Sequence, residues 1–161
     1  MVDTPYDVAI VGASLAGCAT ATFLGRAGKR VALLERHTDP GAYKHLCTTL
    51  IQASAEPAIQ RLGLDEAMAR AGGLRPPFAV WTRWGWITDA HGARGFTIRR
   101  EKLDPMIREL AASTPGVDFL PGHTLKSVLT EHGRVVGVGA ETAEGACREV
   151  RAHLVVGADG R

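Results

Sequence analysis

The sequence predicts an α/β fold in which a parallel sheet is crossed by a β-meander. An N-terminal β-α-β unit is the first observation behind this prediction: short apolar strands at Tyr6–Val11 and Val31–Leu34 flank an Ala-rich helix at Ser14–Ala27. A series of β runs separated by turn residues in the C-terminal third is the second. Crossover connections join parallel strands and are right-handed, so the first two strands are expected to lie parallel.

The ends of these N-terminal elements carry the residues that such a unit needs. Gly12 follows the first strand, and Gly28 stands where the C-terminal cap of the helix is expected. Glu35 ends the second strand. One helical face is formed by the apolar side chains at positions 15, 19, 23 and 27.

The middle of the chain predicts mixed elements. The segments are a loop at His37–Thr48, helices at Thr49–Leu62 and Leu64–Ala71 divided by Gly63, strands at Phe78–Thr88 and Gly95–Arg99, and an amphipathic helix at Arg100–Ser113. In the first of these strands, alternation places Trp84 and Trp86 on one face and Trp81 on the other.

The last third predicts strands only. They are expected at Val117–Leu120, Thr124–Thr130, Val135–Glu141, Ala146–Val150 and His153–Gly157. His132-Gly133 and Glu144-Gly145 are hairpin-like turns, so the middle three strands form the meander.

Composition limits the class of protein. The 161 residues suffice for one domain, expected over 1–161, and the 45% apolar and 22% charged content is that of a globular chain. A net charge of +2 indicates neither a nucleic-acid partner nor a membrane surface. The uncharged run Val8–Gly25 is interrupted by glycine and hydroxyl residues, which argues against a membrane span. Three scattered cysteines form neither a disulfide framework nor a zinc pattern, so no metal is expected. With an N-terminus that lacks a basic leader, they favour a cytoplasmic location.

The first motif is Gly12-Ala13-Ser14-Leu15-Ala16-Gly17, a dinucleotide fingerprint in which serine replaces the middle glycine. Gly12 permits the tight turn, and Gly17 lets the helix approach the strand. The helix N-terminus offers unpaired N–H groups to a pyrophosphate. Ser14 is small and has a hydroxyl that can donate to a phosphate oxygen, or it caps the helix.

Glu35 supports the same interpretation. It lies eighteen positions after Gly17 at the end of the second strand, where a carboxylate accepts hydrogen bonds from the ribose hydroxyls of an adenine nucleotide. A carboxylate there also disfavours a 2′-phosphate. The alternative is a solvated charge at a strand end, and the complete β-α-β context favours binding.

The second motif is the strand and turn Gly157-Ala158-Asp159-Gly160-Arg161, which alone is typical of an ordinary strand exit. Together, Asp7–Arg36 and this ending resemble the FAD-binding domain of the aromatic-hydroxylase family, the class A flavin monooxygenases. The resemblance implies a Rossmann-like sheet. It implies that Asp159 and Gly160 lie near the FAD pyrophosphate, and it adds Arg36 to the cofactor site.

Two further positions follow from the resemblance. In the family, an arginine before a helix faces the cofactor phosphates, which implies this role for Arg100 and less directly for Arg99. Leu125, which opens the meander, stands where the family's backbone meets the adenine. The loop Gly41–Cys47 is similar to that of the related geranylgeranyl reductases, in which a lysine and a cysteine lie near the flavin, although a small buried side chain is the favoured interpretation of Cys47.

The resemblance implies the FAD-binding portion of an NAD(P)H-dependent oxidoreductase that hydroxylates an organic substrate, with aromatic compounds as the candidate class. No residue is identified as a catalytic acid or base. The alternatives are a related flavin reductase, a halogenase, or a non-catalytic nucleotide-binding fragment. The family's later flavin-contacting motif and most of its substrate-binding sheet are expected outside this chain. The chain is therefore expected to lack activity alone and to need a C-terminal segment or a partner chain.

Overall fold

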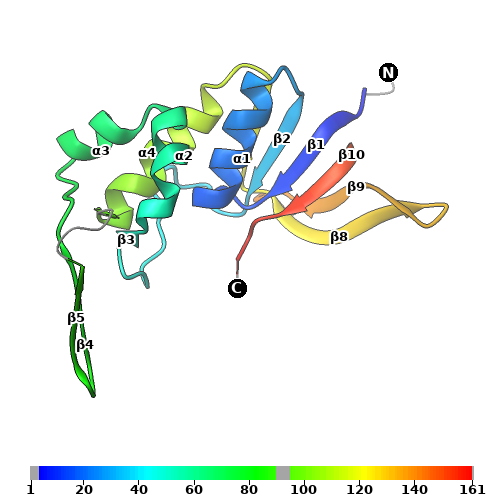
Figure 1. The fold of residues 1–161 in the computed structure, drawn as a ribbon. Helices are drawn as coiled ribbons and strands as arrows, with labels where there is room; N and C mark the ends of the chain where they lie inside the picture. The colour runs from blue at the N-terminus through cyan, green and yellow to red at the C-terminus, as the bar shows by residue number, and fades with distance from the viewer. Residues whose placement is uncertain (1–3, 90–94, 161) are drawn as a thin grey trace. The chain divides into compact units, whose positions relative to one another are not determined.

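The computed structural model describes residues 4–89 and 95–160. The chain is divided into two compact units, one formed by residues 1–43 with 104–161 and the other by residues 44–103 (Figure 1). Arg161 lies outside the described residues.

The first unit is built on a six-stranded sheet of order β7-β2-β1-β10-β9-β8. Its elements are β1 (Tyr6–Val11), α1 (Leu15–Arg26), β2 (Val31–Glu35), the later part of α4 (Arg100–Ala112), β7 (Val117–Pro121), β8 (Thr124–Glu131), β9 (Arg134–Glu141) and β10 (Cys147–Gly157). Strands β7, β2, β1 and the end of β10 are parallel, whereas β10, β9 and β8 form the antiparallel meander. The predicted β-α-β unit and meander are therefore confirmed.

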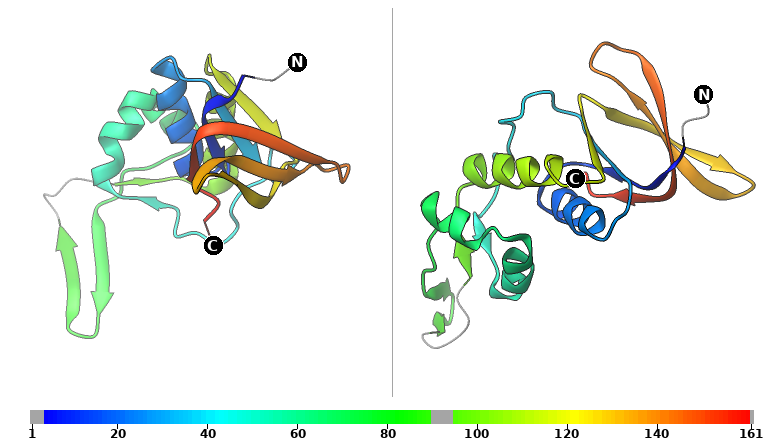
Figure 2. Two further views of the ribbon diagram at one scale, coloured as in Figure 1. Left: turned by 90° about the vertical axis from the view of Figure 1, so that its right-hand side faces the viewer. Right: turned by 90° about the horizontal axis from the view of Figure 1, so that it is seen from above.

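The expected break between two C-terminal strands is wrong, because β10 is one strand of 11 residues. Its first half pairs with β9 as far as Arg151, and its second half pairs with β1 from Ala152 onward. Figure 2 shows β10 continuing from the parallel part of the sheet into the meander. The polar residues that suggested a break lie on the exposed face of the strand, while Val150 and Ala152 are buried.

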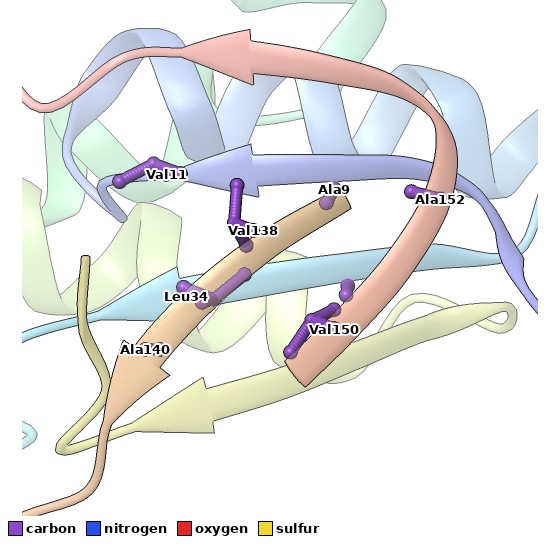
Figure 3. Packing of buried hydrophobic residues seen from close by; sticks show 8 residues of the cluster. Ala9, Val11, Leu34, Val138, Ala140, Val150 and Ala152 are labelled. Atoms are coloured by element: carbon purple, nitrogen blue, oxygen red, sulfur yellow. The ribbon is translucent and has the colours of Figure 1, made fainter. Parts of the chain in front are cut away.

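Strand β10 thus folds the meander over one face of the parallel sheet and encloses an apolar core. Figure 3 shows this cluster, which consists of Ala9, Val11, Ala32, Leu34, Val138, Ala140, Val150 and Ala152. Side chains alternate along a strand, so Val8, Ile10, Val31 and Leu33 face the other side, where α1 packs against β1 and β2. All five residues of β2 are buried, as expected for a strand covered on both faces.

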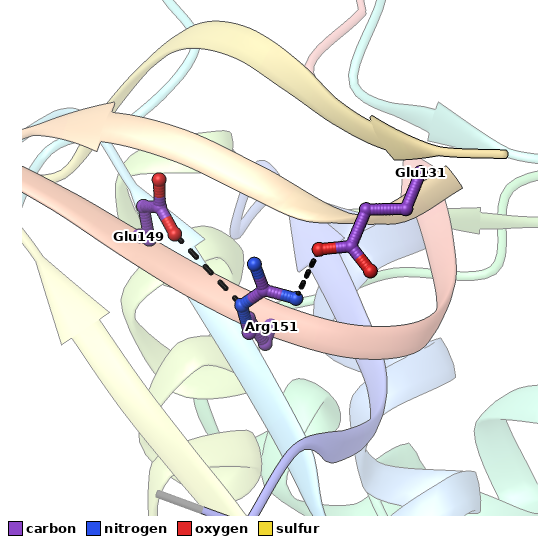
Figure 4. A network of polar contacts seen from close by, with 3 residues as sticks. All are labelled: Glu131, Glu149 and Arg151. Atoms are coloured by element: carbon purple, nitrogen blue, oxygen red, sulfur yellow. Dashed lines mark hydrogen bonds and ion pairs between the residues drawn. The ribbon is translucent and has the colours of Figure 1, made fainter. Parts of the chain in front are cut away.

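The solvent side of the meander carries ion pairs. Arg151 Nη1 lies 2.8 Å from Glu131 Oε1, and Arg151 Nε lies 3.8 Å from Glu149 Oε2 (Figure 4). Because these side chains are half-exposed, the pairs contribute little to stability. The register in which β8 pairs with β9 is set by the turn between them. His132 and Gly133 both have positive φ there, 49° and 74°, as a two-residue hairpin turn requires.

The second unit consists of short elements. They are β3 (Leu50–Ile51), the 3-10 turn η1 (Ala53–Ala55), α2 (Glu56–Leu62), α3 (Asp65–Arg70), β4 (Phe78–Thr82), β5 (Gly85–Asp89), β6 (Phe96–Thr97) and the start of α4. The helix expected from Thr49 is wrong at its beginning, because Leu50 and Ile51 pair with Thr97 and Phe96. The strand expected over 95–99 is reduced to two residues.

The single strand expected at Phe78–Thr88 is a hairpin. Strands β4 and β5 pair in antiparallel fashion through a turn at Arg83 and Trp84. Trp81 and Trp86 are direct cross-strand partners with ring centroids 5.4 Å apart, so the predicted assignment of faces is wrong. The three tryptophans are 64%, 82% and 66% exposed in chain order.

In the described ranges, no helix is both long and apolar enough to cross a membrane.

Candidate dinucleotide-binding site

Three adjacent strands of the first unit bring the sequence motifs to one edge of the sheet. Strands β2, β1 and β10 are neighbours and parallel, so their carboxyl ends lie side by side. Gly12 N donates to Leu34 O at 2.8 Å, and Ala158 N donates to Val11 O at 2.8 Å. The two motifs are more than 140 positions apart in the sequence and adjacent in space, at the place where open α/β sheets bind ligands.

Close backbone packing explains the glycines of the fingerprint. Gly12 has φ +102°, and a Cβ atom there would lie 2.7 Å from Ala158 O and from the backbone of Asp159. A Cβ atom on Gly17 would lie 1.8 Å from Gly12 O. The loop therefore has no room for a side chain at either position, and both glycines are needed for this close packing.

The N-terminus of α1 follows this loop. Ser14 is the N-cap residue, and its carbonyl accepts the hydrogen bond from Cys18 N at 2.9 Å. Within residues 14–27, all of which the structure describes, the Ser14 side chain makes no capping hydrogen bond. The first turn of the helix has no acidic residue. The N–H groups of the first turn and the positive end of the helix dipole therefore suit a pyrophosphate.

Glu35 is held beside this loop and is only 8% exposed. Its Oε2 accepts a hydrogen bond from Ala13 N at 2.9 Å, and its Oε1 accepts one from His37 N at 3.1 Å. Each carboxylate oxygen has about two acceptor positions. One position on each oxygen thus remains for a ribose hydroxyl. The interpretation of Glu35 as a solvated charge does not agree with this burial.

The segment after Glu35 is held by the turn that leads into β8. His123 N donates to Glu35 O at 2.8 Å, and Gly122 N donates to His37 O at 3.3 Å. Leu125 follows two positions later on the edge strand β8. Arg36 is exposed, and its Nε donates to His37 Nε2 at 3.2 Å. The roles of Arg36 and Leu125 in binding stay predictions.

Arg108 is a residue of this region that sequence reasoning missed. It is 6% exposed, and its Nη1 and Nη2 donate to Pro40 O at 2.6 Å and to Ala42 O at 2.9 Å. The sequence pattern of α4 could have indicated this residue. Asp104 and Arg108 stand four residues apart on the helical face of Leu103, Ile107 and Ala111, and all five residues are buried in the structure. Charged residues within an apolar helical face indicate a specific buried role.

Cys18 lies among the buried charges of this interior. Burial raises the pKa of its thiol to about 12. Arg108 nearby lowers this pKa, while Glu35 and Asp104 raise it. The three charged side chains therefore lie within electrostatic range of one buried thiol on α1.

Arg100 and Cys47 belong to the second unit. Arg100 is 8% exposed, and its Nη1 donates to Cys47 Sγ at 3.6 Å. The hydrogen bond from Thr49 N, at 3.4 Å, and the Arg100 guanidinium lower the pKa of the Cys47 thiol. Cys47 is exposed, so its interpretation as a small buried side chain is wrong. A phosphate-binding role for Arg100 stays a prediction.

Comparison with known proteins agrees with this geometry. The model of a family described as "FAD binding domain" matches residues 5–161. The chain belongs to this family. A probable NADH-specific resorcinol 4-hydroxylase of Rhodococcus jostii is 31% identical over 96% of this chain and 30% of its own length. Kynurenine 3-monooxygenase of Salinispora tropica is 32% identical over 95% of this chain and 36% of its own length.

Solved structures give the same result. A myxobacterial chondrochloren halogenase, which is FAD-dependent, matches with a TM-score of 0.84 and 26% identity over 96% of this chain and 37% of its own. The chain thus spans about a third of the length of these relatives. The predicted resemblance and fold class are confirmed, and the residues at the sheet edge fit FAD, because the backbone cradle, helix N-terminus and buried carboxylate lie together.

Proposed function

We propose that this chain is the FAD-binding part of an NAD(P)H-dependent flavin oxidoreductase of the monooxygenase type, acting on a small aromatic substrate. The observation that carries the proposal is the meeting of the Gly12 turn, Glu35 and Asp159 at the ends of three adjacent strands. The names of two relatives, a resorcinol hydroxylase and a kynurenine monooxygenase, support the reaction and substrate class.

In this proposal each part of the site has one task. The Glu35 carboxylate accepts hydrogen bonds from the adenosine ribose. The backbone from Gly12 to Ser14, with the N-terminus of α1, binds the pyrophosphate. Asp159, whose backbone packs against Gly12, and the neighbouring Gly160 position the pyrophosphate. A role for Arg100 toward the phosphates is a separate proposal, which rests on the resemblance to the family.

The cofactor supplies the redox chemistry when it is bound, and the protein supplies binding, orientation and exclusion of water. The reductant proposed is NADH or NADPH, following the NADH specificity in the name of one relative. The close packing of Gly12 against Ala158 and Asp159 would hold the loop in one conformation, which would lower the entropic cost of binding.

Calorimetric titration with FAD, FMN and NAD, on a protein of the relatives' length that contains this chain, tests the binding part. FAD is expected to bind tightest, because FMN lacks the adenosine half and NAD lacks the flavin half. NAD binding equal to or tighter than FAD binding would overturn the assignment. The blue-region absorbance of the purified protein provides a second measurement of the same question.

The reaction is tested by NAD(P)H oxidation with and without small aromatic compounds. Oxidation that is stimulated by substrate and coupled to a hydroxylated product is expected from a protein of the relatives' length that contains this chain. The 161 residues alone are expected to bind FAD without substrate-coupled turnover, because rate depends steeply on the position of the substrate. FAD binding without any stimulation in the longer protein would favour a non-catalytic role.

Halogenation is the second candidate, and the similarity in structure to a halogenase favours it. The same assay discriminates the two activities when chloride or bromide is added. A halogenated product that depends on halide would support the second candidate, whereas a hydroxylated product that is independent of halide would support the first.

A further inference from the structure

Arg108 connects α4 to the loop that follows β2. Its two terminal nitrogens donate to the carbonyl oxygens of Pro40 and Ala42, at 2.6 and 2.9 Å. The side chain is 6% exposed. Its Nε is buried and has no hydrogen-bond partner among the described residues. A buried cation thus directs both ends of its guanidinium to one short stretch of loop backbone.

That stretch of loop is linked to Glu35 along the chain, because only Thr38 separates His37 from Asp39. Gly41 N donates to Asp39 Oδ1 at 2.8 Å, and Ala42 N donates to Asp39 O at 3.1 Å, so residues 39–42 form one turn. Two positions before this turn, His37 N donates to Glu35 Oε1 at 3.1 Å. A shift of the turn would pass through Thr38 to His37 and strain the bond from His37 N to Glu35 Oε1, which orients the carboxylate, while Gly122 N still holds His37 O.

We propose that Arg108 is a positioning residue for the adenosine end of the dinucleotide. It holds the turn at residues 39–42, and through His37 it fixes the Glu35 carboxylate toward the ribose. This inference rests on the proposed function and deepens it, because it makes the affinity for FAD depend on a helix residue that acts through the loop.

The opposite side of the loop is held separately. Gly122 and His123 bond to the carbonyl oxygens of His37 and Glu35, and these bonds do not involve Arg108. The Asp39–Gly41 segment itself is exposed, so Pro40 O can bond to water when Arg108 is replaced. Removal of Arg108 is therefore expected to release the turn while the fold persists.

The first experiment measures ADP binding, because ADP carries the adenosine, ribose and pyrophosphate without the flavin. Calorimetry on the 161-residue chain compares wild type with Arg108→Met, Arg108→Lys and the control Arg151→Met, which removes an exposed cation from the same unit. Arg108→Met is expected to weaken ADP about ten-fold, the equivalent of one hydrogen bond to a charged group. Arg108→Lys is expected to recover part of the loss, and Arg151→Met is expected to leave ADP affinity unchanged.

A double-mutant cycle with Glu35→Ala tests whether Arg108 affects the affinity for ADP through Glu35. If Arg108 acts through Glu35, Arg108→Met adds little to the loss caused by Glu35→Ala, so the two effects are not additive. Full additivity of the two losses in affinity would show that Arg108 does not act through Glu35, and would overturn the inference. In NMR spectra without ligand, Arg108→Met is expected to shift the His37 amide more than that of Ala13, because only His37 belongs to the loop that Arg108 holds.

The outcomes separate the two proposals. Wild-type protein that binds neither FAD nor ADP would overturn the proposed function together with this inference. Tight wild-type binding that Arg108→Met leaves unchanged would overturn this inference alone. If Arg108→Met does not fold, Arg108→Lys decides the question. The one nitrogen of lysine cannot occupy the positions of both guanidinium nitrogens, so ADP is still expected to bind more weakly than to wild type.

Discussion

The two units of this chain differ in how completely local sequence encodes them. In the first unit, the strands carry residues with no exposed surface, such as Ile10, Leu33 and Val138. In the second unit, the strands are two to five residues long and expose most of their large apolar side chains. Long, buried elements repeat their pattern often enough to be recognised, whereas elements of two to five residues do not. The expected elements of the first unit are accordingly accurate except for the break within β10, whereas those of the second are wrong at several points.

The cysteines and glycines of each unit show how tightly the chain is packed around single positions. In the first unit Cys18 is buried and Cys147 is exposed, and in the second unit Cys47 is exposed. In the first unit, Gly12 is confined by backbone atoms and Gly28 is open; in the second unit, Gly95 is confined by Ile51 O and Gly63 is open. The tight packing at Gly12 lies at the candidate site, and the following predictions test whether it is needed there.

The largest effect is expected from Gly12→Ala. The added Cβ would meet Ala158 and Asp159 backbone atoms at 2.7 Å, so the two motifs would have to separate. FAD binding, followed by calorimetry, is expected to be lost.

Gly28→Ala is the matched control for this substitution. Gly28 also has a positive φ, +77°, but it has no atom within 4 Å of the added Cβ. Both variants carry the left-handed backbone penalty of about 1–2 kcal/mol. Only Gly12→Ala is expected to lose FAD, and FAD retention by that variant would contradict the fingerprint interpretation.

Thiol alkylation near neutral pH should label Cys47 much faster than Cys18, since the thiolate is the reactive form and Cys18 is buried. The pKa of Cys18 is raised to about 12, whereas that of Cys47 is lowered from its ordinary value. Mass spectrometry of a Cys147→Ser background checks the order of labelling. Labelling of Cys18 before Cys47 in folded protein would contradict the packing described for α1.

The same pKa values predict a pH dependence of stability. Because the pKa of Cys18 is about 12 in the folded state and 9.0 ordinarily, its thiol leaves stability unchanged below about pH 9. Above that pH the unfolded chain loses the proton first, so stability falls as the pH rises toward about 12. Denaturant titrations of Cys18→Ala are expected to show a smaller alkaline loss than those of wild type.

Glu35→Ala is expected to weaken ADP and FAD by about ten-fold to a hundred-fold, since hydrogen bonds to a charged group are lost. The variant should also be less stable, because Ala13 N and His37 N lose their acceptor. Glu109→Ala, an exposed change on α4, is the control. A change in affinity within two-fold would mean that Glu35 does not contact the ribose.

The smallest effect is expected in tryptophan fluorescence. All three tryptophans lie in the exposed hairpin of the second unit. Emission from the folded chain should therefore resemble that of tryptophan in water and change little on unfolding, while circular dichroism follows the loss of the sheet. A strongly blue-shifted emission would show that the hairpin is covered in solution.

The sequence by itself determined the β-α-β unit, the turn at Gly12, the strand end at Glu35 and the hairpin turn at His132-Gly133. Each depends on neighbours within a few positions, where periodicity and backbone preference act directly. It did not determine that Trp81 faces Trp86, because one turn at Arg83 and Trp84 reverses the alternation.

Only the tertiary structure decided the contacts between distant positions. The packing of Gly12 against Asp159, the hydrogen bonds from Arg108 to the loop at residues 40–42, and the pairing of Leu50 with Thr97 all join segments far apart in the chain. Such contacts depend on how the sheet brings its strand ends together, and a local pattern carries no information about its distant partner. The candidate residues could therefore be predicted one by one, while their assembly into a site was fixed by the order of strands in the sheet.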